Sequence, residues 1–154
     1  MELLNTYSLL KNHIIDGKFA RSDFFVRLLA IENYYGKNDF GIDIYNKMQK
    51  QKGAKAFDRG KCSFCNIVES FEKNGFILHE NNYIVMNKVL RLTAGAHRLA
   101  CCLYFYIESV PFYVDFNTKK DTIRGVKWFR DKKFDSKSIN RIIERQEAFL
   151  NGCI

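Results

Sequence analysis

The chain has 154 residues, of which 47% are hydrophobic and one is proline, a composition that excludes a disordered protein and suffices for a real core. Its formal net charge of +8 favours an anionic partner such as a nucleotide, a nucleic acid or a membrane surface, although a lysine-rich surface explains the same charge. The lysines are spread along the chain rather than clustered, which weakens the nucleic-acid alternative.

The first 50 residues are expected to form an N-terminal helical region. Apolar side chains at helical spacing predict helices over residues 3–15, 22–35 and 40–49, the second opening on a Ser-Asp cap. That second helix should be largely buried because its apolar coverage is broad. The polar, basic stretch at residues 49–60 is interpreted as a linker or a mobile loop.

Residues 57–116 are expected to form a small α/β unit. Helices are predicted over residues 62–74 and 96–106. Pro111 places the last strand at a sheet edge, or marks a strand start. Strands are predicted near residues 76–79, 83–87, 89–93 and 109–115.

Residues 117–154 are expected to form a C-terminal helical hairpin. Its first helix is predicted over residues 121–130, and Asp135-Ser136 can cap the second. The fold class that follows is α+β, a small mixed sheet with packed helices, flanked by N- and C-terminal helices within one compact domain.

The start of the chain carries no basic leader with an apolar run, and the longest apolar run, residues 99–107, is too short for a bilayer. The five cysteines have no framework spacing, which is typical of reduced thiols. We therefore expect a cytoplasmic protein with no membrane partner.

The single Cys-x-x-Cys motif is formed by Cys62 and Cys65. It lacks the further ligands of a zinc site, and a redox role is a minor alternative to a structural one.

A strand, a glycine and a helix follow one another at residues 90–105. Gly95 supplies the backbone freedom of a sharp turn, and the first amides of a helix carry partial positive charge without an internal partner. The amides of Gly95, Ala96, His97 and Arg98, with the two side chains of His97 and Arg98, would cradle a phosphate. A simple tight turn, with Arg98 on the surface, explains the local pattern equally well.

Gly95-Ala96-His97-Arg98, an apolar helix and the following Ile-Glu-Ser-Val-Pro-Phe-Tyr-Val at residues 107–114 resemble the signature half of the ParB/sulfiredoxin superfamily. The helix that begins near Cys65 and the Gly-Phe dipeptide that follows it at residues 75–76 are similar to the segment that precedes the first strands of that domain. The resemblance covers residues 57–116. It implies a sulfiredoxin-like fold whose Gly-x-x-Arg turn holds nucleotide phosphates, as in CTP-binding ParB, ATP-dependent sulfiredoxin and free-serine kinases.

The chain departs from this family at two positions. Sulfiredoxin has its reactive cysteine where this chain has Ala96, which argues against sulfinic-acid repair. Kinase-like members carry an aspartate where this chain has Ala94. That change removes a base or metal ligand but leaves the phosphate-binding amides in place.

The first hypothesis is a nucleotide-dependent phosphotransferase that uses ATP or another nucleotide with Mg²⁺ and acts on a small hydroxylated metabolite. The leader at residues 32–41 and the Trp-Phe helix are similar to ParB-like proteins of bacterial surface-polysaccharide loci, which implies a substrate of that biosynthesis. Glu69 and Glu80 are the candidate catalytic carboxylates, Arg59 is a second candidate phosphate contact, and no protein metal ligand is assigned. Surface solvation is the alternative for each.

The second hypothesis is a non-catalytic nucleotide- or DNA-binding ParB-like module, with DNA as the weaker partner. The alanine at position 94 favours it. A third is an interaction protein with an empty nucleotide site, although an idle site has no need for both His97 and Arg98.

Overall fold

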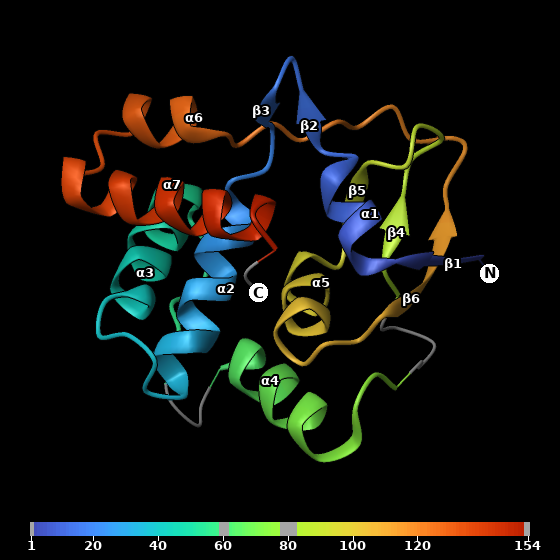
Figure 1. Cartoon of the computed structure of the whole chain (residues 1–154), viewed down its shortest axis with the longest axis horizontal. Coiled ribbons are helices and arrows are strands. Elements are labelled where there is room, and N and C mark those ends of the chain that lie inside the picture. The colour runs from blue at the N-terminus through green and yellow to red at the C-terminus, as the bar shows by residue number, and fades with distance from the viewer. Residues whose placement is uncertain (1, 59–61, 78–82, 153–154) are drawn as a thin grey trace.

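The computed structural model describes residues 2–58, 62–77 and 83–152 and shows an α+β fold, as predicted (Figure 1). Four strands form a mixed sheet and two form a separate hairpin. The elements in chain order are β1 (Glu2–Asn5), α1 (Thr6–Lys11), β2 (Ile14–Ile15), β3 (Lys18–Phe19), α2 (Asp23–Tyr34), α3 (Gly41–Lys52), α4 (Ser63–Asn74), β4 (Val85–Met86), β5 (Leu92–Ala94), α5 (Ala96–Tyr104), β6 (Ser109–Val114), α6 (Val126–Asp131) and α7 (Ser136–Leu150).

The chain starts with a strand, so the helix predicted over residues 3–15 is wrong at both ends. β1 pairs antiparallel with β6, far along the sequence, and this pairing overrides the helical spacing. α1 begins only where Asn5 Oδ1 accepts hydrogen bonds from the next amides, Tyr7 N and Ser8 N. After α1 the chain turns into the hairpin of β2 and β3.

The sheet has the order β1-β6-β4-β5, with β6 parallel to β4 and β4 antiparallel to β5. β6 is therefore a central strand, and the edge position predicted from Pro111 is wrong. Pro111 lies two residues before Tyr113, whose N donates to Ile84 O, and so it precedes the described pairing of β6 with β4, which begins at Tyr113 and Val85.

The other strand predictions hold in part. The segment predicted over residues 83–87 contains β4, and the one predicted over 89–93 is shifted to β5. The shift has a local cause, a turn in which Leu90 N donates to Asn87 O and Leu90 adopts φ 59°. Residues 76–77 are not in a strand, and the rest of that predicted strand lies outside the described residues.

The predictions of α2, α3, α4 and α5 are confirmed within a few residues. α5 lies in the middle of the molecule, between α2 and the sheet, with α4 below it (Figure 1). Buried residues from the N-terminal helices, the α/β unit and the C-terminal hairpin belong to one hydrophobic core. α2 and α3 cross so closely that a Cβ on Gly41 would lie 2.0 Å from Leu29 O.

The segment predicted as a linker at residues 49–60 is partly ordered. α3 continues to Lys52 and ends at Gly53, which is left-handed. Beyond it Phe57 is 5% exposed, and its backbone N donates to Asn46 Oδ1 at 2.7 Å. The segment up to Asp58 is therefore held against α3.

The C-terminal hairpin is confirmed, with a later start. α6 begins at Val126 rather than near residue 121, since Arg124 N donates to Ala20 O in an isolated bridge beside β3. α7 is capped as predicted, because Asp135 Oδ2 accepts from Ser138 N at 3.1 Å. None of the helices in the described part of the chain is both long and apolar enough to cross a bilayer.

Candidate anion-binding site at the start of α5

The strand–glycine–helix bend is present as predicted and requires glycine. Gly95 joins β5 to α5 with φ 97° and ψ 24°, a left-handed conformation. A Cβ there would lie 3.0 Å from the Cα of Ile84 and 3.1 Å from Tyr83 O. The first intrahelical bond runs from Leu99 N to Gly95 O, so the amides of Ala96, His97 and Arg98 form the open first turn of α5.

The His97 side chain is turned toward α3 and α4. A hydrogen bond of 2.9 Å joins its Nε2 to Tyr45 Oη, and the ring of Phe64 packs edge-on at 4.6 Å. Burial, followed by the charges of Arg27 and Lys52, lowers the pKa of His97 well below 6.5. The imidazole is therefore neutral, and with Nε2 engaged by Tyr45 only Nδ1 remains to meet a ligand.

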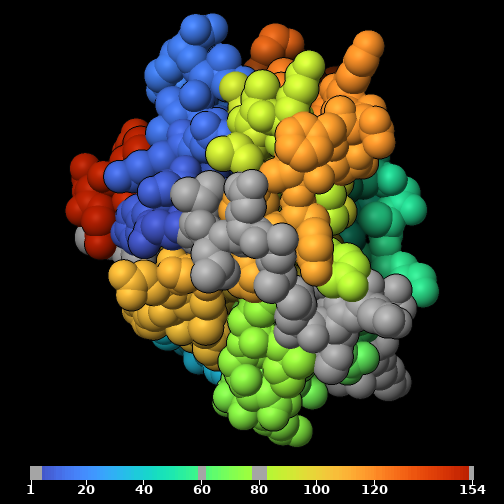
Figure 2. Space-filling model, turned by 90° about the vertical axis from the view of Figure 1, so that its right-hand side faces the viewer, coloured from blue at the N-terminus to red at the C-terminus, as the bar shows by residue number. Residues whose placement is uncertain are grey.

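The Arg98 side chain diverges from His97 and lines a hollow of about 220 Å³ between α4 and α5. Figure 2 shows the face of the molecule on which the residues of α4 adjoin those of α5. Partial burial lowers the pKa of Arg98, which stays charged at neutral pH. The other residues that line this hollow are Asn66, Ile67, Ser70, Phe71, Gly75 and Ile77.

A buried carboxylate with two arginines lies next to this bend. Asp23, fully buried at the first turn of α2, accepts two bonds of 2.9 Å from Arg21 and one of 2.8 Å from Arg27. Arg21 also donates to Leu92 O on β5, three residues before Gly95. Burial alone would raise the pKa of Asp23, but the two guanidinium groups lower it below its ordinary value, so it is ionised.

Two more cations approach the same carboxylate and leave positive charge in excess. Arg124 Nη1 lies 4.0 Å from Asp23 Oδ2. Burial, followed by the charges of Arg27 and Arg124, lowers the pKa of Lys52 to about 8. Arg27 is 3% exposed, yet its Nε has no hydrogen-bond partner in the described part of the chain. Since several partly buried cations share one carboxylate, an added anion would be stabilised here.

These cations, Arg21, Arg27, Lys52 and Arg124, are the functional candidates that the sequence analysis missed. A signal was present, because Asp23 and Arg27 are four residues apart in a helix whose neighbours are apolar. Charged residues on the buried face of such a helix must be paired. Lys52 and Arg124 join them only through the tertiary fold.

The remaining predicted site residues do not meet at this bend among the described residues. Glu69, on α4, accepts a hydrogen bond of 2.9 Å from Tyr34 Oη and does not line the Arg98 hollow. Arg59 and Glu80 lie outside the described residues. Within the described ranges no three His, Cys, Asp or Glu side chains are grouped as metal ligands would be.

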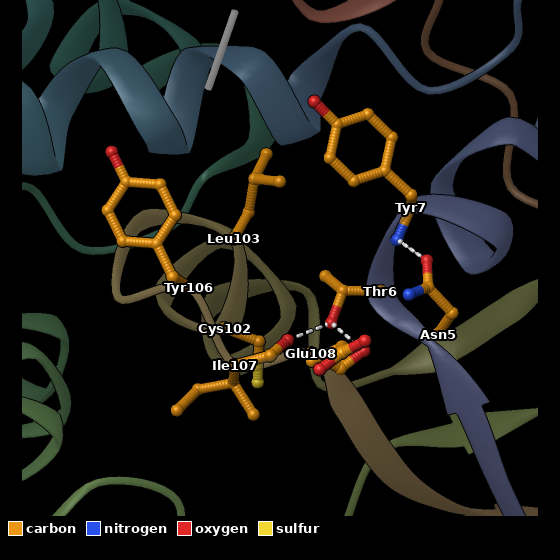
Figure 3. A pocket seen from close by; sticks show the side chains of 8 residues that line it. All are labelled: Asn5, Thr6, Tyr7, Cys102, Leu103, Tyr106, Ile107 and Glu108. Carbon is orange, nitrogen blue, oxygen red and sulfur yellow. Dashed lines mark hydrogen bonds between the residues drawn. The ribbon is translucent and has the colours of Figure 1, made fainter. Parts of the chain in front are cut away.

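A second hollow, of about 180 Å³, lies at the other end of α5 (Figure 3). Its lining is mainly apolar, with Leu103, Tyr106 and Ile107 on one side and Tyr7 on the other. Thr6 Oγ1 donates to Ile107 O within it. Among the described residues no cationic side chain lines this hollow, so it does not suit a phosphate group.

Comparison of the chain with models of protein families gave no match, and neither did comparisons with curated proteins or with solved structures. The resemblance to the ParB/sulfiredoxin superfamily therefore remains a prediction from the residues, and the geometry of the bend must be judged on its own physical chemistry.

Proposed function

We propose that this protein binds a nucleotide through its phosphate groups at the first turn of α5. The observation that carries the proposal is the excess of cationic side chains around that turn. Among the described residues, the charges that act most on His97 are those of the cationic Arg27, Lys52 and Arg98 and of the anionic Asp23. A polyphosphate would neutralise this excess and accept hydrogen bonds from the first-turn amides of α5.

In this proposal each residue around the first turn of α5 has a separate role in binding the phosphates. The amides of residues 96–98 and the guanidinium of Arg98 hold phosphate oxygens. Lys52 supplies a further charge from the end of α3. Tyr45 fixes the orientation of His97 and, through it, of the α5 terminus. Mg²⁺ would arrive with the nucleotide, held by the phosphates rather than by a protein carboxylate cluster.

Phosphoryl transfer to a small hydroxylated metabolite of surface-polysaccharide biosynthesis is a further proposal, and it rests on the resemblance alone. Such a reaction needs a carboxylate near the acceptor hydroxyl. Asp23 is saturated by arginines and Glu69 is bonded to Tyr34. The described residues thus support binding more directly than catalysis. The cytoplasm, which supplies nucleotides and Mg²⁺, is the proposed compartment.

DNA is a weaker proposal for the anionic partner. The exposed face of α7, the longest helix of the C-terminal hairpin, carries Glu144 and Glu147 as well as Lys137. Acidic residues on a helix oppose insertion between phosphate backbones. Absence of DNA binding near 50 mM salt, where such binding is strongest, would eliminate this alternative.

Calorimetric titration with ATP, ADP and CTP, each with Mg²⁺, tests the proposal. At least one nucleotide should bind, and Arg98→Gln and Lys52→Gln should each weaken it about tenfold, equivalent to about 1.4 kcal/mol. Lys50→Gln is the matched control, because Lys50 is exposed on the same helix. The proposal is wrong if no nucleotide gives heat, or if all three variants bind as the wild type does. Release of ADP on addition of candidate acceptors would separate transfer from binding.

A further inference from the structure

The two cysteines of the Cys-x-x-Cys motif at the start of α4 have sulfur atoms close enough to form a disulfide. Cys62 is the N-cap of α4, and its Sγ accepts a hydrogen bond of 3.1 Å from Cys65 N. The two Sγ atoms lie 2.7 Å apart, and neither cysteine is in a disulfide. A small movement of the sulfur atoms would therefore bring them to the length of a disulfide bond, about 2.05 Å.

The two cysteines differ in the way that a stepwise exchange needs. Cys62 is half-buried and so accessible to a small reagent, whereas Cys65 is buried and donates to Asp58 O at 3.1 Å. The Cys65 amide, in the first turn of α4, already donates a hydrogen bond to the Cys62 sulfur. Cys62 is thus the attacking thiol and Cys65 the resolving one.

The other described cysteines give an internal contrast. Cys101 and Cys102 are buried within α5, and burial raises the pKa of the Cys102 thiol to about 12 and that of Cys101 further still. Neither forms a thiolate at neutral pH, so both should resist exchange.

We propose that Cys62 and Cys65 form a reversible intramolecular disulfide by exchange with a small disulfide of the glutathione class. The deprotonated Cys62 sulfur attacks one sulfur of the reagent and expels the other as a thiolate, which leaves a mixed disulfide on Cys62. Cys65, after losing its proton, attacks Cys62 Sγ and expels the second thiolate. The chain loses two electrons and two protons, and the reagent is reduced to two thiols.

The disulfide would alter the surroundings of the proposed phosphate site. Oxidation removes the S–H group through which Cys65 holds Asp58 O. Phe64, which lies between the two cysteines in sequence, packs on His97. Oxidation of this pair would therefore change contacts at the side of the proposed phosphate site that α4 forms. Formation of the disulfide does not itself depend on nucleotide binding.

Oxidation of the intact chain by glutathione disulfide, followed by alkylation of the remaining thiols and peptide mapping, tests the proposal. The wild type should lose two alkylation sites, Cys62 and Cys65 together, while Cys101 and Cys102 remain thiols. Cys153→Ser, at a position outside the described residues, should behave in the same way. The proposal is overturned if oxidation links any other pair, or if no intramolecular link forms while a free dithiol in the same solution is oxidised.

A pair of variants tests the assigned roles. Cys65→Ser should trap glutathione on Cys62, at least about tenfold faster than Cys62→Ser traps it on the buried Cys65. Equal rates would overturn the assignment of attacking and resolving thiols. Reduction of the oxidised wild type by dithiothreitol should restore both alkylation sites, and failure to restore them would contradict reversibility.

Discussion

Tyr45 on α3 and His97 in the first turn of α5 are 52 residues apart in sequence and are joined by a hydrogen bond of 2.9 Å between Oη and Nε2. Burial raises the pKa of Tyr45 to about 12, so its hydroxyl keeps its proton at any ordinary pH. The neutral imidazole can accept this bond from the tyrosine hydroxyl or donate to it through Nε2. One side chain of the N-terminal region thus holds the imidazole of a residue at the candidate site in place.

Tyr45→Phe should weaken nucleotide binding severalfold and lower the free energy of unfolding by about 1 kcal/mol, because one partly buried hydrogen bond is lost. Tyr34→Phe is the matched control, since it removes a tyrosine bond of equal length to Glu69. It should leave nucleotide affinity unchanged. Calorimetry and urea unfolding of both variants measure these effects, and equal losses of affinity would contradict the role given to Tyr45.

Nucleotide binding at pH 8 should take up protons. The pKa of Lys52 in the free protein is about 8, so about half of the chains carry a neutral Lys52 at that pH. A phosphate nearby raises that pKa, and uptake should approach about half a proton per ligand. Calorimetry at one pH in buffers of different ionisation enthalpy measures this uptake. It should vanish in Lys52→Met, and saturable binding without uptake in the wild type would show that Lys52 does not face the ligand.

Gly95→Ala should destabilise the fold by about 3 kcal/mol, because the alanine is strained at positive φ and its Cβ also meets Ile84. Gly36→Ala is the matched control, since Gly36 has φ +76° but open space around it. It should cost only about 1 kcal/mol. Urea unfolding compares the two variants, and equal costs would mean that the close approach at the bend is unimportant.

Stability should fall as the pH drops from 6.5 to about 4. His13 is 1% exposed, its Nδ1 donates to Leu9 O, and its Nε2 accepts from Leu92 N. Burial lowers its pKa to about 4, so below pH 6.5 the unfolded chain binds a proton that the folded chain does not. The contribution is complete above pH 6.5, and about 3 kcal/mol is lost by pH 4.

Unfolding of the wild type and of His13→Gln across this range measures that loss, since an amide can replace both hydrogen bonds without titrating. The variant should lose clearly less stability than the wild type on acidification. Parallel losses would assign the pH dependence to other groups, including His97.

The helices were predictable where local periodicity and caps agree with the tertiary packing. α2, α3, α4 and α7 were predicted from apolar spacing, and the Asp135 cap was confirmed. The strands were harder because they depend on distant partners. β1 exists because β6 pairs with it, and β6 is a central strand although it contains Pro111.

The backbone bend of the candidate site could be predicted from the sequence, whereas the clustering of cationic side chains around it could not. Gly95 and its position before α5 follow from strand, glycine and helix signals in one short stretch. Lys52 and Arg124 approach Asp23 because the C-terminal end of α3 and the segment before α6 both pack near the start of α2. No sequence pattern predicts this tertiary packing. The divergence of His97 and Arg98 likewise depends on Tyr45 and α4.

The most direct test of the central claim is the amide spectrum of the first turn of α5 during titration with ATP and Mg²⁺. In an ¹⁵N-labelled protein the amides of Ala96, His97 and Arg98 should show the largest, saturable shifts, as expected when the first-turn N–H groups of a helix donate to phosphate oxygens. If the nucleotide binds and these three amides stay unmoved while others shift, the phosphate does not lie at this turn and the account is wrong.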